Sequence, residues 1–362
     1  MKELWIPKDK CTACGACQNM CPVDAIEMAD DGSGFIYPRV TDKCISCNQC
    51  EEVCNERTML KCGAFVQRIY AARSKNEGIR FESTSGGIFS ELANYILKED
   101  GYIVGAAYND RNLVEHALIK SDIELATLRK SKYVQSIIGN IYREIKHGLE
   151  ENRKVLFCGA PCQVAGLKAF LGKDYGNLYT MDFICRGMNS IKAYESWLNE
   201  LEECQKCKVK NVWFKYKQDG WKDSPLCTRI DFEDGSNRIL KKDDNLFMRG
   251  YLGPNIYIRP SCGDCDFKGE QRLSDITVAD FWKNNSELDD DKGLSMVLIN
   301  SEKGNELYNC IKDKISYERK TMEDVKRGNK CFESSVYINK KTDEFMNRLD
   351  IMRFSEAIER YL

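Results

Sequence analysis

Apolar and polar positions follow two different periods along most of the chain, and segments with one period alternate with segments of the other. Residues 66–72 and 102–108 are short, largely apolar runs, which predicts strands. Between them, residues 87–98 repeat apolar side chains every three or four positions, which predicts an amphipathic helix. Gly101 follows that helix and predicts its end.

The same two periods continue toward the end of the chain. They predict helices at 134–150, at 164–171 and up to about residue 203, with a helical tail from about residue 342. They predict strands at 154–157, 177–184, 209–217, 227–232, 275–281 and 294–299. Because strands alternate with helices, we expect an α/β body, built on a mixed sheet with flanking helices.

The first 60 residues carry a duplicated cysteine pattern, Cys-x2-Cys-x2-Cys-x3-Cys. The two copies lie 33 residues apart, at Cys11, Cys14, Cys17, Cys21 and at Cys44, Cys47, Cys50, Cys54. This pattern is typical of a bacterial-type ferredoxin with two 4Fe–4S clusters, which is a small α+β domain. The fourth cysteine of each run reaches the other cluster, because one tight loop cannot span a whole cube. We therefore expect one cluster on Cys11, Cys14, Cys17 and Cys54, and the other on Cys44, Cys47, Cys50 and Cys21.

Two other uses of these cysteines fit less well. Disulfides need an oxidising compartment, and zinc sites favour paired Cys-x2-Cys knuckles without a third cysteine in step. Pro22 follows Cys21 as the motif expects, whereas Asn55 follows Cys54 where proline is usual, which predicts a looser turn but no lost ligand. Cys62, in the connector after this domain, is expected to be an unliganded thiol.

Composition narrows the class of protein. The 362 residues include 19 cysteines and show neither a signal peptide nor a long apolar run, which predicts a reducing cytoplasm and no membrane segment. The net charge is −2, and residues 1–60 alone carry 6 Lys/Arg and 10 Asp/Glu. An acidic head on a nearly neutral body argues against a nucleic-acid partner. The two histidines, His116 and His147, are expected to be ordinary core or surface residues.

Three turns in the body are suited to an anion such as phosphate. Residues 83–87 and 158–163 lie before predicted helices, where backbone N–H groups and the helix dipole favour negative charge. Residues 130–133 precede the predicted helix at 134–150 and add cationic and hydroxyl side chains. Each turn alone is also an ordinary helix cap. No G-x-G-x-x-G follows a strand, so a Rossmann dinucleotide site is not supported.

A second set of cysteines lies in the body, at Cys158, Cys162, Cys185, Cys204, Cys207, Cys227, Cys262, Cys265, Cys310 and Cys331. Cys262-x2-Cys265 is the clearest metal-binding knuckle, because small and turn-forming residues separate its two thiols. A four-cysteine zinc site on Cys204, Cys207, Cys262 and Cys265 is one alternative.

Several segments of the body resemble, in the same order, the coenzyme F420 hydrogenase/dehydrogenase beta-subunit family. They are Ala72-Arg73-Ser74, Ser85-Gly86-Gly87, residues 131–136, residues 157–167, Cys185, Cys262-x2-Cys265 and residues 274–282. The most specific parts are Pro161-Cys162-Gln163 and the late Cys-x2-Cys followed by Asp280-Phe281-Trp282. A chlorophyll-pathway reductase is similar too, so the resemblance does not tie the fold to coenzyme F420.

The resemblance implies that the body binds FAD and a third 4Fe–4S cluster. The cluster ligands would be Cys162, Cys185, Cys262 and Cys265, without Cys158, at whose position a small residue such as serine is usual. The FAD contacts would be Ser85, Gly86, Gly87, Lys132, Tyr133, Ser136, Gly159, Ala160, Pro161 and Gln163. The expected domains are then a ferredoxin domain at 1–62, two parts of a flavin-binding body at 66–148 and 150–330, and a helical tail at 331–362.

The resemblance also implies an oxidoreductase. FAD would exchange hydride with coenzyme F420 or another organic substrate, and single electrons would pass between FAD, the body cluster and the ferredoxin clusters in either direction. The partner would be a redox protein or a small hydride donor or acceptor, and the chain could form a homo- or hetero-oligomer. No side chain stands out as a catalytic acid or base. Two alternatives stay open: a ferredoxin-driven reductase that does not use F420, and a non-enzymatic electron-transfer subunit.

Overall fold

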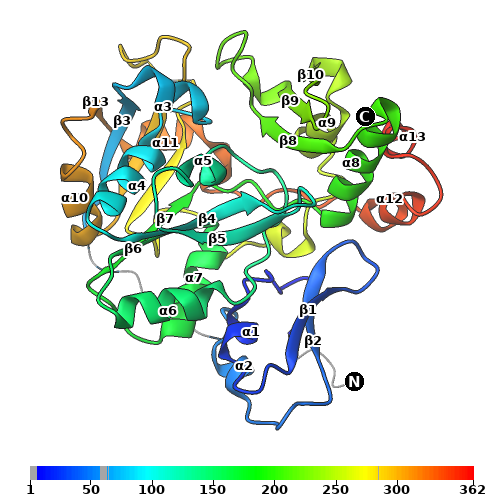
Figure 1. The fold of residues 1–362 in the computed structure, drawn as a ribbon, viewed down its shortest axis with the longest axis horizontal. Coiled ribbons are helices and arrows are strands. Elements are labelled where there is room, and N and C mark those ends of the chain that lie inside the picture. The colour runs from blue at the N-terminus through cyan, green and yellow to red at the C-terminus, as the bar shows by residue number, and fades with distance from the viewer. Residues whose placement is uncertain (1–5, 58–62, 64, 284) are drawn as a thin grey trace.

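The computed structural model describes residues 6–57, 63, 65–283 and 285–362, so Cys62 lies outside the described residues. A small N-terminal domain lies against one side of a larger α/β body (Figure 1). Both the α/β body and the small ferredoxin-like head confirm the predicted fold class. Within the described ranges, no helix is long and apolar enough to cross a membrane.

The N-terminal domain repeats its structure as it repeats its sequence. It consists of a hairpin and two short helices: α1 (Ala16–Met20), β1 (Ile26–Asp30), β2 (Ile36–Val40) and α2 (Gln49–Glu52). Gly15 precedes α1 and Asn48 precedes α2, and both adopt left-handed backbone conformations, with φ of 78° and 60°. The two positions are 33 residues apart, so each cysteine run turns into its helix in the same way.

The body is organised around an eight-stranded mixed sheet with the order β13-β3-β12-β11-β7-β6-β4-β5. Its strands are β3 (Arg68–Ser74), β4 (Tyr102–Tyr108), β5 (Val114–Ile119), β6 (Val155–Cys158), β7 (Leu178–Phe183), β11 (Ile276–Asp280), β12 (Ser295–Ile299) and β13 (Ile315–Lys320). The four central strands β11, β7, β6 and β4 are parallel. Their carboxyl ends therefore meet at one edge of the sheet, which is where open α/β sheets bind ligands.

Helices cover the sheet through their apolar faces. They are α3 (Glu77–Glu82), α4 (Ile88–Lys98), α5 (Leu125–Leu128), α6 (Ile141–Glu150), α7 (Pro161–Leu171), α10 (Glu302–Asn309) and α11 (Met322–Gly328). Ile88, Leu92 and Ile96 of α4 are buried as the helical spacing predicts, and they pack with Leu156 of β6. Burial of each such aliphatic side chain contributes about 1.5–3 kcal/mol. The helix α7 begins at Pro161, in its first turn, where the missing N–H group leaves no hydrogen bond unmade.

The prediction of a helix at 134–150 was wrong for residues 134–140, which are not helical. The helix begins at Ile141, because the preceding residues pair with β5 in extended conformation. The N–H of Ile137 donates to the carbonyl of Val114 at 2.9 Å, and the N–H of His116 donates to the carbonyl of Ile137 at 2.9 Å. Gly139 then turns the chain with a φ of 56°. The β-branched residues before Gly139 suit this conformation better than a helix.

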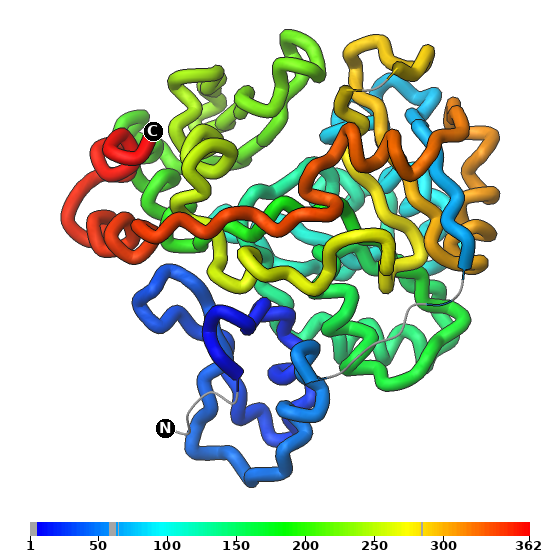
Figure 2. Tube along the Cα trace, turned by 180° about the vertical axis from the view of Figure 1, so that it is seen from behind, coloured from blue at the N-terminus to red at the C-terminus, as the bar shows by residue number. Residues whose placement is uncertain are grey.

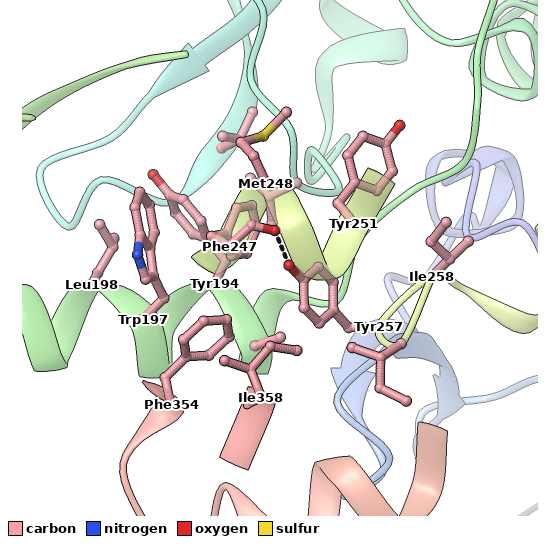
Figure 3. Packing of buried hydrophobic residues seen from close by; sticks show 14 of the residues in the cluster. Tyr194, Trp197, Leu198, Phe247, Met248, Tyr251, Tyr257, Ile258, Phe354 and Ile358 are labelled. Atoms are coloured by element: carbon pink, nitrogen blue, oxygen red, sulfur yellow. Dashed lines mark hydrogen bonds between the residues drawn. The ribbon is translucent and has the colours of Figure 1, made fainter. Parts of the chain in front are cut away.

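A second layer carries an aromatic core of its own. It consists of the antiparallel strands β8 (Val209–Phe214), β9 (Cys227–Phe232) and β10 (Asn237–Lys241) with α8 (Ile191–Gln205) and α9 (Leu246–Leu252). Trp197 stacks on Phe247 with ring centroids 4.9 Å apart, and the hydroxyl of Tyr257 donates to the Phe247 carbonyl (Figure 3). The strand predicted at 209–217 ends at Phe214, because Lys215 turns the chain with a φ of 56°.

The tail crosses the back of the body before it packs on this core (Figure 2). It ends in two short helices, α12 (Thr342–Arg348) and α13 (Phe354–Ile358), which agrees with the predicted helical tail. Phe345, Phe354 and Ile358 are buried among the aromatic side chains of α8 and α9. The tail is therefore part of the body's packing.

Candidate functional site

A cavity of about 500 Å³ lies where the parallel strands end. Cys158 at the end of β6, Cys185 just after β7 and Asp280 at the end of β11 all line it. The aromatic layer closes another side through Met248 and Tyr251. The sheet topology thus brings together residues that are more than 100 positions apart in the sequence.

The cavity wall is strongly basic. The basic side chains that line it are Arg129, Lys130, Lys132, Arg186, Lys215 and Lys330, whereas Asp280 is the only acidic residue among its described lining residues. Asp280 forms an ion pair with Lys215, whose side chain is 4% exposed. Arg129 is also paired, with Glu82 at 2.7 Å, which leaves Lys130, Lys132, Arg186 and Lys330 to attract an anionic ligand.

Among the basic residues that line the cavity, Lys132 has the pKa that burial lowers most. Burial and the neighbouring Lys130 ammonium lower the pKa of Lys132 to about 7. Its Nζ donates to the carbonyl of Arg129 at 2.8 Å, a neutral partner that does not supply a counter-charge. A negative charge bound in the cavity would restore the ordinary charge of this amine.

A chain of hydrogen bonds forms the floor of the cavity. Gln163 Nε2 donates to Ser136 Oγ at 3.0 Å, and Ser136 Oγ lies 3.0 Å from His116 Nδ1. His116 Nε2 lies 3.2 Å from the carbonyl of Cys158, which can only accept, so Nε2 carries the proton and Nδ1 accepts from Ser136. Burial lowers the pKa of His116 to about 4, which keeps the ring neutral near pH 7. Ser136 and Gln163 therefore use part of their hydrogen-bonding capacity within this network, which fixes the positions of the side chains at the floor.

The structure brings most of the predicted FAD contacts to this cavity. Those that line it are Ser85, Gly87, Lys132, Tyr133, Ser136, Gly159, Ala160 and Gln163. Gly86 does not, because its N–H donates to Ser295 Oγ at 2.9 Å and a Cβ there would lie 2.4 Å from the Ala72 carbonyl oxygen. Pro161 lines a neighbouring pocket instead. Gly86 thus allows its own backbone to lie close to the Ala72 carbonyl.

Sequence reasoning missed the group around Lys215. Its ammonium lies 4.8 Å from the centroid of the Trp282 ring, which is stacked on Trp221 at 4.3 Å. Burial opposes the charge of Lys215, but Asp280 outweighs burial and raises the pKa of the amine. Lys215 stands in a polar stretch after β8, so periodicity contains no signal for it. Asp280 and Trp282 belong to the Asp-Phe-Trp segment that the sequence singled out.

A second pocket, lined by five thiols, adjoins the cavity. The thiols belong to Cys162, Cys185, Cys262, Cys265 and Cys331. Cys162 lies in the first turn of α7, Cys185 follows β7, and Cys262 lies in a short 3₁₀ turn at Pro260–Gly263. Burial raises the pKa of Cys185 to about 12, so a thiolate there needs a cation such as iron.

The thiols of the zinc alternative are not brought together. Cys262 and Cys265 share their pocket with Cys162 and Cys185, while Cys204 is exposed near the end of α8. Among the described residues, no three His, Cys, Asp or Glu side chains are close enough to bind a single metal ion. Thiolates at the corners of a four-iron cube lie farther apart than those on one zinc ion.

The N-terminal domain places its cysteines in the crossed arrangement. Burial raises the pKa of Cys17, and the neighbouring Cys14, Cys11 and Cys54 add to the rise, which places these four thiols together. The other four line a separate small pocket: Cys21, Cys44, Cys47 and Cys50. Cys47 is exposed, so this second group lies at the outer end of the domain.

The inner cysteine group contacts helix α7 directly. A Cβ on Gly166 would lie 2.9 Å from Cys14 Cβ, so glycine is needed for this approach. The hydroxyl of Tyr142 lies 2.8 Å from the carbonyl oxygens of both Cys14 and Gln163. Asn55 Nδ2 donates to the Cys162 carbonyl at 3.0 Å, a bond that the usual proline could not make. The residue that departs from the ferredoxin motif thus joins that domain to the body.

Comparison with protein families matches three parts of the chain. Residues 10–58 match a 4Fe–4S dicluster domain. Residues 69–141 match the N-terminal part of the coenzyme F420 hydrogenase/dehydrogenase beta subunit, and residues 152–325 match its C-terminal part. The chain belongs to the coenzyme F420 hydrogenase/dehydrogenase beta-subunit family. The resemblance predicted from the motifs is thereby confirmed, together with the dicluster head.

Individual relatives of this F420 beta-subunit-family chain are distant. It is 24% identical over 303 residues to the coenzyme F420-dependent sulfite reductase of Methanocaldococcus jannaschii, covering 82% of this chain. The chain spans 41% of the length of that relative. Among solved structures, one of the F420-reducing [NiFe] hydrogenase complex from Methanosarcina barkeri aligns with a TM-score of 0.49 and 20% identity, covering 83% of this chain and 95% of the other.

Both beta-subunit halves contribute to the cavity in this family member. Residues 69–141 supply Lys132 and the turn at Ser85, and residues 152–325 supply Gly159, Cys185 and Asp280. The chain therefore combines a 4Fe–4S dicluster domain with both parts of the beta-subunit family. Cys331 lies beyond the matched ranges, although the structure places it at the thiol pocket.

Proposed function

We propose that this protein passes electrons between FAD, bound in the basic cavity, and three 4Fe–4S clusters. One observation carries the proposal: the cavity and the thiol pocket share a wall. Cys185, Arg186 and Gly187 line both spaces, and so do Met188 and Cys331. A flavin in the first space would therefore lie beside a cluster in the second, with only these residues between them.

The proposed ligands combine the thiols that share a pocket with the family resemblance, which selects four of the five thiols in the body pocket. The body cluster would use Cys162, Cys185, Cys262 and Cys265. The inner ferredoxin cluster would use Cys11, Cys14, Cys17 and Cys54, and the outer one Cys21, Cys44, Cys47 and Cys50. The sites then form one series from the cavity to the exposed Cys47.

The residues around the cavity fit FAD. The N–H groups at the start of α4 and the basic wall suit a pyrophosphate, and Met181 and Val278 offer apolar surface. When bound, FAD supplies the exchange of a two-electron hydride for single electrons. The chain itself contributes orientation: the neutral His116–Ser136–Gln163 network fixes the floor, and Lys215 is held by Asp280.

The hydride partner we propose is coenzyme F420, because the chain belongs to a family described by that coenzyme. Anaerobically purified protein should contain FAD, and reduced F420, NADH and reduced ferredoxin are then added in separate samples while the flavin absorbance is recorded. Bleaching by reduced F420 supports the proposal. Bleaching by reduced ferredoxin alone would identify a ferredoxin-driven reductase. Absence of bound flavin would contradict the proposal and indicate an electron-transfer subunit.

Lys132→Met is expected to weaken FAD binding about 10- to 100-fold, because a hydrogen bond from a charged group is worth about 1.5–3 kcal/mol. The pKa of this amine is lowered to about 7 in the ligand-free site, so binding of an anion takes up a proton. Wild-type affinity should therefore fall as the pH rises through 7, and the variant should lose this dependence. Fluorescence titration of deflavinated protein at pH 6, 7 and 8 measures both effects.

The matched control for Lys132 is the exposed Lys146 on α6, where Lys146→Met should leave affinity and its pH dependence unchanged. If Lys132→Met retained the wild-type pH profile, another group would be responsible for it.

A further inference from the structure

Arg259 lies between two of the proposed cluster sites. It lines the thiol pocket of the body, and its carbonyl accepts from the N–H of Cys262 at 3.0 Å. Its side chain extends toward the N-terminal domain, where Nε donates to the carbonyl of Cys11 at 2.8 Å. A single guanidinium group thus contacts the backbone of an inner ferredoxin cysteine and borders the pocket of the body cluster.

The Arg259 guanidinium is buried with neutral partners. Its relative exposure is 0%; Nη1 donates to Gln135 Oε1 and Nη2 donates to the Ile36 carbonyl, both at 2.9 Å. It also lies 4.5 Å from the centroid of the Tyr37 ring. Two other arginines are buried among the described residues, and each has a carboxylate partner: Arg80 pairs with Asp290 and Arg272 with Asp182. No ion pair in the described part of the chain involves Arg259.

A buried cation without a counter-charge is costly. Removing a charged group from water costs several kcal/mol even after relaxation, and hydrogen bonds to neutral carbonyls offset only part of this cost. The two adjoining thiol groups provide the missing negative charge once they hold clusters. A 4Fe–4S cube with four thiolates is an anion, and it gains a further negative charge on reduction.

We propose that Arg259 is the shared counter-charge of the body cluster and the inner ferredoxin cluster, and that it raises the reduction potentials of both. This inference rests on the proposed function, because it requires both clusters to be present. Its physical basis is that a fixed positive charge stabilises the reduced, more negative form of each cluster over the oxidised form. Arg259 is thus a positioning residue for electron transfer, acting through charge and through its bond to Cys11.

The test is an anaerobic redox titration of the full chain, monitored by electron paramagnetic resonance. In Arg259→Met, the midpoint potentials of the body and inner clusters should both shift to more negative values. The outer cluster on Cys21, Cys44, Cys47 and Cys50 serves as an internal control and should keep its potential. Arg259→Lys retains the charge and should remain closer to wild type than Arg259→Met.

Gln135→Glu tests the charge without removing the arginine. The new carboxylate would keep the oxygen that accepts from Arg259, so the pair becomes neutral, and it would lose only the longer bond from Gln135 Nε2 to the Thr12 carbonyl at 3.3 Å. We expect the same negative shift of both potentials. If Arg259→Met does not fold, Gln135→Glu alone tests whether the Arg259 charge raises the two potentials.

Unchanged potentials in Gln135→Glu with full iron content would overturn the proposal, and a shift of the body cluster alone would overturn the shared role. These results differ from a failure of the proposed function, in which wild-type protein itself would lack the third cluster's iron.

Discussion

Cys262→Ser is expected to remove about one third of the iron and to leave the two ferredoxin clusters in place. Wild-type protein, purified without oxygen, should contain about twelve irons, four for each cluster. Cys262 lines the thiol pocket with Cys162, Cys185 and Cys265, and it is distant in sequence from the ferredoxin runs. Loss of one thiolate should release the body cluster as a unit, because three ligands leave a corner iron open to solvent.

Iron analysis and electron paramagnetic resonance of the dithionite-reduced protein measure this loss. Cys310→Ser is the matched control, since Cys310 is exposed at the end of α10 and should be replaceable without loss of iron. Cys331→Ser tests the choice of ligands, because its thiol lines the same pocket. If Cys331→Ser lost a third of the iron and Cys262→Ser kept all of it, Cys331 would be the cluster ligand in place of Cys262. Full iron in both variants would refute the body cluster as assigned.

Arg272→Met is expected to lower the free energy of unfolding by about 3–5 kcal/mol, the usual cost of leaving one member of a buried ion pair alone. Arg272 Nη2 lies 2.8 Å from Asp182 Oδ2, and their side chains are 2% and 1% exposed. Asp182 also accepts from Thr277 Oγ1 at 2.6 Å, which joins the adjacent strands β7 and β11. Without Arg272, the carboxylate would remain buried with too few partners.

Thermal unfolding at one heating rate compares Arg272→Met with wild type and with the double variant Asp182→Asn/Arg272→Met. The double variant removes the isolated charge, so it should recover much of the lost stability. If Arg272→Met melted at the wild-type temperature, Asp182 would have to gain another partner or take up a proton. Equal melting temperatures for the single and the double variant would show that the lost packing of Arg272, rather than the lone charge, causes the destabilisation.

Elements with a complete apolar face were predictable from the sequence alone. The strands at 102–108 and 227–232 and the helix that buries Ile88, Leu92 and Ile96 were located closely, because each has a regular period and clear ends. The edge strands β5 and β13 were missed. Each borders the sheet on one side only, and its pattern is weak: Glu115 and His116 interrupt the apolar run of β5, and four of the six residues of β13 are polar or charged. Tertiary pairing also overrode the helical spacing before Ile141.

The composition of the candidate site was predictable only in part. The ferredoxin runs have a spacing with a direct chemical meaning, and the body thiols came from motif resemblance. Neither way could assign Lys215 or Cys331 to the site. Lys215 reaches the cavity because the chain turns after β8, and Cys331 reaches the thiol pocket because the tail crosses the back of the body. Sequence spacing carries no information about such long-range paths.

The tight contact between α7 and the ferredoxin domain determines whether the rate of electron transfer would depend on the viscosity of the solvent. In proteins whose carrier domain swings on a linker, each transfer waits for diffusion and slows as viscosity rises. Here Gly166 allows α7 to touch Cys14, and Tyr142 and Asn55 connect the two parts through backbone carbonyls. The distance between the inner ferredoxin site and the body site is therefore set by packing, and the proposed electron transfer between them would not depend on domain diffusion.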